Sequence, residues 1–104
     1  MFEGSKVELK MEKAVIISAL PDEGIHICKV LRYDPEEDYI RLSLEKEELQ
    51  TIQLDAKYRC DILTKTEIVT CTGVVKERFH DETGNVLIFK IENGFYSSQK
   101  TSKK

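Results

Sequence analysis

The sequence has no tryptophan, only two prolines and five glycines, and no long apolar run. The glycines lie far apart, so the chain lacks the glycine-rich loop that cradles phosphate at a helix start. The longest apolar run, residues 14–17, is far too short to span a bilayer. The first residues also lack the basic start and apolar stretch of a signal peptide. These absences predict a cytoplasmic protein that does not enter a membrane.

Cysteine and histidine are scarce and poorly spaced for catalysis or metal binding. Cys28, Cys60 and Cys71 each lie inside an apolar run, and none has a neighbour at the spacing of a zinc ligand. We expect buried free thiols in a reducing compartment, with a disulfide or a metal site as the alternatives. His80 beside Asp81 is a base next to an orienting carboxylate, but no nucleophile turn accompanies the pair. An enzyme that uses His80 is therefore the last-ranked hypothesis, and we expect no cofactor.

The charge balance is mildly acidic, with 16 Lys and Arg against 19 Asp and Glu and a formal net charge of -3. This balance provides no general attraction to nucleic acid or anionic lipid. The acidic clusters Glu36–Asp38 and Glu45–Glu48 fall in a turn and a connector, where carboxylates are normally solvated. The first cluster also lacks the spacing of a calcium-binding loop. We expect neither an acid–base pair nor a calcium site.

What the sequence does contain is period-two alternation of apolar and polar residues, which is typical of half-buried strands. The clearest example is the stretch 24–44, in which two strand-like arms flank the acidic turn Asp34–Asp38. Ile40, Leu42 and Leu44 form one face of the second arm, and a slip of one residue would put Arg41 in the core. The first arm is apolar on both faces, which indicates either burial on both sides or a bulge.

Further strands are predicted at residues 7–11, 58–62, 67–79 and 86–91, with residues 14–17 continuing the first after a bend. Gly73 inside a long strand predicts a bulge or sharp bend. Residues 45–50 favour a helix and predict one short helical connector. We expect residues 80–85 to form a loop and Asn93–Gly94 to end the last strand.

This pattern predicts an all-β fold, namely a small antiparallel β-barrel of six or seven strands. A chain of 104 residues supports a single core. Short turns without a long helix require antiparallel pairing, and barrel closure removes exposed edges. We predict a disordered segment at residues 1–5, one barrel domain at 6–94 and a polar, basic tail at 95–104. A free strand edge at 7–11 or 86–91 could pair two chains into a homodimer.

The order of these features resembles the N-terminal, PilZN-like domain of PilZ-type flagellar brake proteins. The resemblance runs from about Val7 to Phe79, and it rests on VELKM, HICKVLRYDPEEDYIRLSL, LDAKYRCDIL and TCTGVVKERF. Lys76 and Arg78 fit the basic position near the end of the family's valine-rich strand. The resemblance implies a small split β-barrel that accompanies a PilZ domain in bacterial second-messenger or motility signalling.

The motifs with which that family grips cyclic di-GMP are missing. They are Arg-x-x-x-Arg, and Asp or Asn followed two residues later by Ser; no two arginines here are four apart, and no Asp or Asn precedes such a serine. We therefore expect a non-enzymatic regulatory module that binds a protein partner and does not bind cyclic di-GMP itself. The alternative is a barrel that binds a nucleotide or single-stranded nucleic acid through Arg41, Arg59, Lys76 and Arg78.

Overall fold

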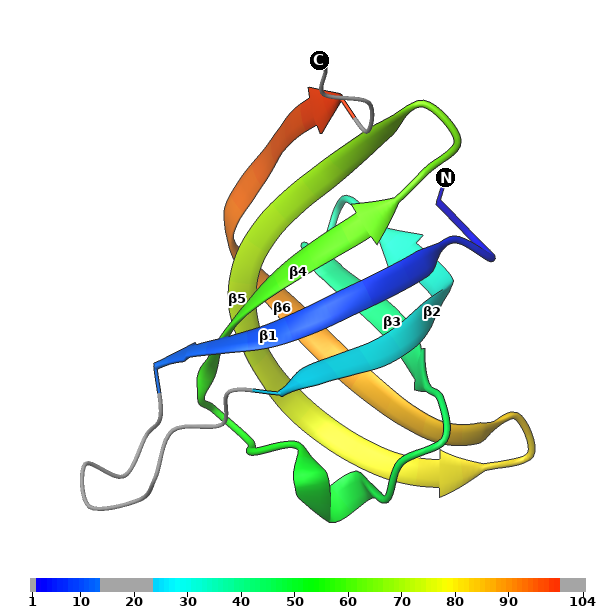
Figure 1. Ribbon diagram of the computed structural model, residues 1–104. Helices are drawn as coiled ribbons and strands as arrows, with labels where there is room; N and C mark the ends of the chain where they lie inside the picture. Colours follow the sequence, from blue (N-terminus) through cyan, green and yellow to red (C-terminus); the bar gives the residue numbers. More distant parts are fainter. Residues whose placement is uncertain (1, 14–23, 100–104) are drawn as a thin grey trace.

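Six antiparallel strands close into a barrel in the computed structural model, which describes residues 2–13 and 24–99 (Figure 1). The order around the barrel is β1-β2-β3-β6-β5-β4. The predicted all-β antiparallel barrel is confirmed. The elements are β1 Lys6–Lys13, β2 Ile25–Asp34, β3 Tyr39–Leu44, the 3-10 helix η1 Leu49–Thr51, β4 Lys57–Leu63, β5 Glu67–Asp81 and β6 Gly84–Gln99.

The predicted hairpin is formed by β2 and β3. Asp34 Oδ1 accepts hydrogen bonds from the backbone amides of Glu36 (3.0 Å) and Glu37 (3.1 Å), which holds the acidic turn in place. The pairing register shifts between Val30 and Arg32, so the predicted bulge in the first arm is present. The apolar face of β3 is buried as expected, while Arg41 on the other face is only half-buried.

The interior of the barrel is filled by apolar side chains from all six strands. The cysteines are among them, and the expectation of buried free thiols is confirmed. The largest fully buried side chains are those of Tyr58, Phe89, Leu9, Ile40, Leu42, Ile52, Ile62, Leu87, Val7, Val30, Val75 and Val86. A core of this kind accounts for the alternation seen in the sequence, because inward side chains recur at every second position of a strand.

The connector between β3 and β4 closes one end of the barrel. It contains one short helix, η1, so the predicted short helical connector is present, but it is a single 3-10 turn that overlaps only the end of the predicted range 45–50. A single helical turn is too short to be stable without packing, and the connector is held by tertiary contacts instead. Nη1 of Arg78 donates to the Ile52 carbonyl and lies 3.4 Å from the Leu49 carbonyl oxygen. Arg78 thereby fastens the connector to β5.

Strands β5 and β6 are longer than the sequence indicated. Asp81 pairs with Gly84, so the predicted loop at residues 80–85 is reduced to a tight turn. Asp81 Oδ1 accepts hydrogen bonds from the Thr83 amide (2.8 Å) and hydroxyl (2.6 Å). Strand β6 does not end at Asn93–Gly94, because its later residues pair with the start of β5 as far as Gln99. Residues 95–99 of the predicted tail are therefore strand, and residues 100–104 lie outside the described residues.

The N-terminal segment is ordered, contrary to the prediction for residues 1–5, of which 2–5 are described. The Gly4 amide donates to the Val30 carbonyl (2.8 Å), and the Val30 amide donates to the Ser5 carbonyl (3.0 Å). The Phe2 ring centroid lies 5.7 Å from that of Tyr33 and 5.6 Å from that of Phe95. These aromatic contacts give the segment an apolar anchor. The apolar run 14–17 lies outside the described residues.

Neither strand edge that was predicted to pair two chains is free. Strand β1 pairs with both β2 and β4, and residues 86–90 of β6 pair with both β3 and β5. In the described part of the chain, residues 92–99 of β6 have no strand partner on the side away from β5. Residues 75–81 of β5 likewise have no strand partner on the side away from β6. Within residues 2–13 and 24–99, no helix is long and apolar enough to cross a membrane.

Candidate functional site

Two adjoining hollows lie on the barrel surface around the start of β1. The first, of about 610 Å³, is lined by residues 2–6 and 63–65. The second, of about 560 Å³, is lined by Gly4, Lys6, residues 27–29 and residues 45–47. The two hollows share Gly4 and Lys6. Hollows of this size fall within the range of small-ligand sites.

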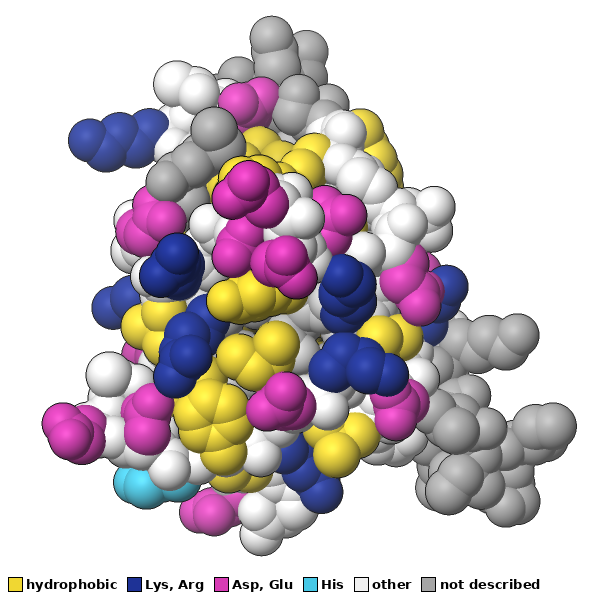
Figure 2. Space-filling model, turned by 180° about the vertical axis from the view of Figure 1, so that it is seen from behind, with side chains coloured by type: hydrophobic (Ala, Val, Ile, Leu, Met, Phe, Trp, Pro, Cys, Tyr) yellow, Lys and Arg dark blue, Asp and Glu magenta, His cyan; other side chains and the backbone are white. Residues whose placement is uncertain are grey.

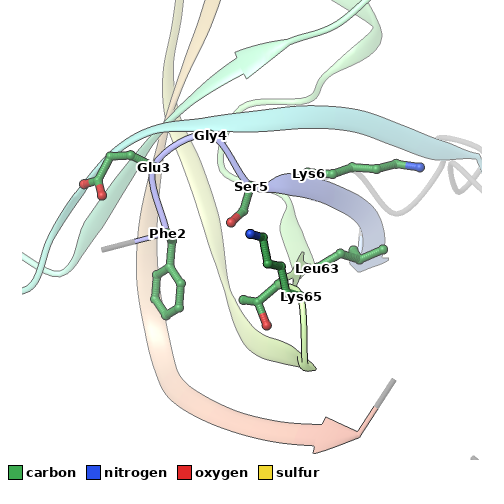
Figure 3. Close-up of a pocket in the computed structure, with 8 residues that line it drawn as sticks. Phe2, Glu3, Gly4, Ser5, Lys6, Leu63 and Lys65 are labelled. Atoms are coloured by element: carbon green, nitrogen blue, oxygen red, sulfur yellow. The ribbon is translucent and has the colours of Figure 1, made fainter. Parts of the chain in front are cut away.

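The first hollow lies where the N-terminal segment meets the turn between β4 and β5 (Figure 3). In this view Lys65 extends toward Ser5, whereas Lys6 extends away from Lys65. The backbone of Gly4 has a φ of 84°, a conformation that suits glycine, and a Cβ there would meet nothing within 4 Å. The space beside Gly4, which lines both hollows, is therefore open.

The cations of the hollows have no ion-pair or hydrogen-bond partner among the residues that the structure describes. Within the described residues, no acidic group or hydrogen-bond acceptor engages the side chain of Lys6, Lys29, Lys46 or Lys65, and all four are exposed. We call this set the lysine rim. Lys6 and Lys29 are also directly opposite each other in the β1–β2 pairing. Like charges at such positions destabilise a sheet, so the repulsion between Lys6 and Lys29 lowers the stability of the fold.

The two glutamates that line the second hollow already accept hydrogen bonds from other side chains. The Ser43 hydroxyl donates to Glu45 Oε2 (2.7 Å). Glu47 Oε1 lies 2.8 Å from His26 Nδ1 and accepts a hydrogen bond from the Thr51 hydroxyl (3.0 Å). These contacts orient both carboxylates toward the protein, so neither one pairs with the lysine between them.

A third, smaller hollow of about 340 Å³ holds a neutralised ionic network. Asp61 is only 7% exposed, and its Oδ1 accepts a hydrogen bond from the Thr70 hydroxyl (2.7 Å). Its Oδ2 lies 3.1 Å from Arg59 Nη2 and 3.5 Å from Lys10 Nζ. Arg59 Nε is buried without a partner in the described residues. The charges of this hollow largely satisfy one another.

Arg41, the first of the residues suggested by the sequence, lies on the outer face of the barrel. Its Nη2 lies 3.2 Å from Asp81 Oδ2, and its guanidinium carbon is 5.3 Å from the centre of the Phe79 ring. A hydrogen bond from the Thr83 hydroxyl is the main reason why the pKa of Asp81 is lowered, and Arg41 lowers it further. Arg41 is therefore held by a cation–π contact and an ion pair.

The other three suggested residues are also occupied. Arg59 pairs with Asp61, and Arg78 donates to connector carbonyls. Lys76 Nζ lies 2.8 Å from Asp55 Oδ1, and this partner raises the pKa of the lysine. Arg41, Arg59 and Lys76 have separate acidic partners, so the structure does not combine the suggested residues into one site. On the face shown in Figure 2, Lys and Arg alternate with Asp and Glu around apolar side chains.

The pKa of Asp81 provides a direct check of this local geometry. We expect the Asp81 carboxyl to titrate below the usual range of aspartate in a carbon-detected NMR titration. Thr83→Val should raise its pKa more than Arg41→Met does, because the Thr83 hydroxyl is the larger cause. A lowered pKa in the folded state adds stability that is present above the unfolded-state pKa and lost as the pH falls through the folded-state value. A larger rise in Arg41→Met would contradict the assignment.

The lysine rim was missed by the sequence reasoning. Its members come from β1, β2, the connector and the β4–β5 turn, and no two of them are near neighbours in the sequence. The sequence alone could not have identified the lysine rim. Lys6 and Lys29 are exposed strand residues, but whether an acidic residue lies opposite either of them can be decided only when the register of the strands is known. The arginines attracted attention because they can bind bidentately, and the same property lets them pair inside the fold.

The thiols offer no reactive nucleophile. Burial raises the pKa of Cys28, and the neighbouring Glu47 and Glu45 raise it further. A hydrogen bond with Cys71, together with burial, raises the pKa of Cys60. Since the thiolate is the reactive form, these cysteines are inert core residues.

No protein-family model, no characterised protein and no solved structure matches this chain.

Proposed function

We propose that this chain is a non-enzymatic, cytoplasmic regulatory module that binds a protein partner by accepting a strand along β6. The observation that carries the proposal is the edge of residues 92–99 on the side away from β5, which has no strand partner in the described part of the chain. An edge of this kind presents backbone N–H and C=O groups that an extended segment of another protein can pair with. We call it the β6 edge.

The composition of the β6 edge favours addition of a strand. Natural proteins protect exposed edges with charges, proline or very short strands. Residues 93–99 contain neither a charged residue nor a proline, and the one charged residue of the edge, Glu92, lies 2.7 Å from Lys57 Nζ. Tyr96 is 62% exposed and offers an apolar ring with a polar tip. The register of β6 against β5 shifts within this edge, between Thr70 and Thr72 and between Thr72 and Gly73, so an added strand would have to follow these irregularities.

The alternative of nucleotide or single-stranded nucleic-acid binding has less support. Such binding needs basic side chains that follow one groove, with aromatic rings beside them on which bases stack. Arg41, Arg59, Lys76 and Arg78 each contact a different group of the protein. The buried free thiols agree with a reducing compartment and hence with a cytoplasmic location. From the PilZN-like resemblance we add the proposal that the partner belongs to cyclic di-GMP or motility signalling.

Site-specific photo-crosslinking in cells tests strand addition at the β6 edge. We expect a photoreactive residue in place of Tyr96 to give a protein adduct, because this exposed side chain lies on the edge strand. The same probe in place of Glu36, which is also exposed and lies in the acidic turn, should give none. An adduct of twice the mass of the chain would identify a second copy as the occupant. Equal labelling at both positions would contradict the proposal.

Calorimetric titration separates this function from the alternative. We expect no heat from cyclic di-GMP or from a thymidine oligonucleotide at low ionic strength, where phosphate contacts are strongest. Micromolar binding of either would overturn the protein-module proposal in favour of ligand binding.

A further inference from the structure

We propose that the two adjoining hollows bind an acidic segment of a protein, held by the lysine rim. The proposal concerns a different surface from the β6 edge and goes beyond strand addition. It starts from the distribution of unpaired charge in the described residues. Lys10, Arg41, Lys57, Arg59 and Lys76 have carboxylate partners, while Arg78 and Lys90 donate to backbone carbonyls.

The remaining cations of the described side chains are the lysine rim and Arg32, which is exposed on β2. All of the rim lines the hollows, with Lys65 in the first, Lys29 and Lys46 in the second, and Lys6 in both. Among the described side chains, the cations without a partner are thus concentrated in the two hollows, with Arg32 as the exception. The same area contains the directly opposed pair Lys6 and Lys29, whose repulsion a bound anion would relieve.

An extended acidic chain fits these hollows better than a compact phosphate ligand. The lysines are distributed over two adjoining hollows that share Gly4 and Lys6, and the space beside Gly4 is open. Glu3 in the first hollow and Glu45 and Glu47 in the second lie among them and would repel a ligand that concentrates several negative charges at one point. Carboxylates spaced along a peptide can each meet one lysine and avoid the three glutamates. The half-buried Ile27 and Leu63 offer apolar contact to aliphatic stems.

Nucleic acid is the less favoured occupant. Base stacking requires exposed aromatic faces, and the aromatic residue of these hollows, Phe2, packs between Tyr33 and Phe95. The net charge of -3 opposes a polyphosphate chain over the rest of the surface. A protein segment meets the lysines locally without following the whole surface.

Fluorescence anisotropy with a labelled deca-glutamate peptide tests the proposal on the full chain. We expect saturable binding that weakens as salt is added. The double variant Lys29→Glu/Lys46→Glu should reduce the affinity by about tenfold or more, because it replaces attraction with repulsion at two contacts. The control Lys76→Glu makes the same kind of charge change on β5, outside both hollows, and should change the affinity by less than about twofold.

Amide chemical-shift mapping on the unmodified protein gives a second test that does not depend on a variant. We expect the peptide to shift the amides of the lysine rim and to leave that of Lys76 unchanged. Tighter binding of a decathymidine oligonucleotide or of tripolyphosphate would overturn the proposal, as would an equal loss in Lys76→Glu or the absence of peptide binding. Tyr96 lines neither of the two hollows, so crosslinking there does not depend on the lysine rim and failure of one proposal can be told from failure of the other.

Discussion

Gly73→Ala should destabilise the barrel by about 3 kcal/mol, the upper end of what overpacking usually costs. Gly73 lies inside β5, where it pairs with Tyr58 of β4 and Ile91 of β6. A Cβ at this position would collide with the Lys90 carbonyl oxygen and lie 2.9 Å from its carbon. These atoms belong to the backbone of the neighbouring strand, so no side chain can rotate away. Relief requires β5 and β6 to separate.

Equilibrium unfolding in urea measures this loss of stability. The loss appears as a lower urea concentration at the unfolding midpoint, while the dependence of the unfolding free energy on urea concentration stays the same. The matched control is Gly94→Ala on β6, where an added Cβ meets nothing within 4 Å. We expect that variant to change the free energy of unfolding by less than about 0.5 kcal/mol. If both variants unfolded at the wild-type midpoint, β5 and β6 would not approach each other as closely as the structure requires.

Gly73 also shows how far the sequence can predict the fold. A glycine within an apolar strand predicts a bulge, and the register does shift between Thr72 and Gly73. The hairpin around Asp34, the buried face of β3 and the buried cysteines were predicted for the same reason. Each depends on spacing within one strand or turn, and such spacing is visible in the sequence.

The sequence-based predictions were wrong where the structure of a segment is decided by contacts with residues elsewhere in the chain. The polar residues after Gly94 read as a tail, yet they continue β6 because residues 67–70 of β5 provide a pairing edge. Phe2 has no periodic neighbours, yet it is anchored by Tyr33 and Phe95. Tertiary contacts override local propensity in both cases.

The candidate site was beyond sequence reasoning for a related reason. Whether a cation is available depends on which acid lies across the strands, and that depends on register. Arg41 pairs with Asp81 and Arg59 pairs with Asp61, so neither arginine is available to a ligand. Lys6 and Lys29, in contrast, face each other. The composition gives the number of charged residues but does not show which of them form ion pairs.

Phe89→Ala should cost about 4 kcal/mol, because a large side chain in the barrel core is removed and a cavity remains. Phe89 is fully buried on β6, opposite Ile40 of β3 and Val75 of β5. Strands on both sides hold its backbone in a closed barrel, so the walls cannot collapse freely into the space. Thermal unfolding followed by circular dichroism should show a lower midpoint temperature. Unfolding in urea should show a loss of unfolding free energy of the same size.

The control for this variant is Tyr96→Ala, which removes an aromatic ring from the same strand at a position that is 62% exposed. We expect a loss below about 1 kcal/mol, since little apolar surface is withdrawn from water there. The contrast tests the register of β6, because a slip by one residue would turn Phe89 outward and Lys90 inward. Similar losses in the two variants would show that Phe89 does not occupy the core, and would contradict the pairing of β6 with β3.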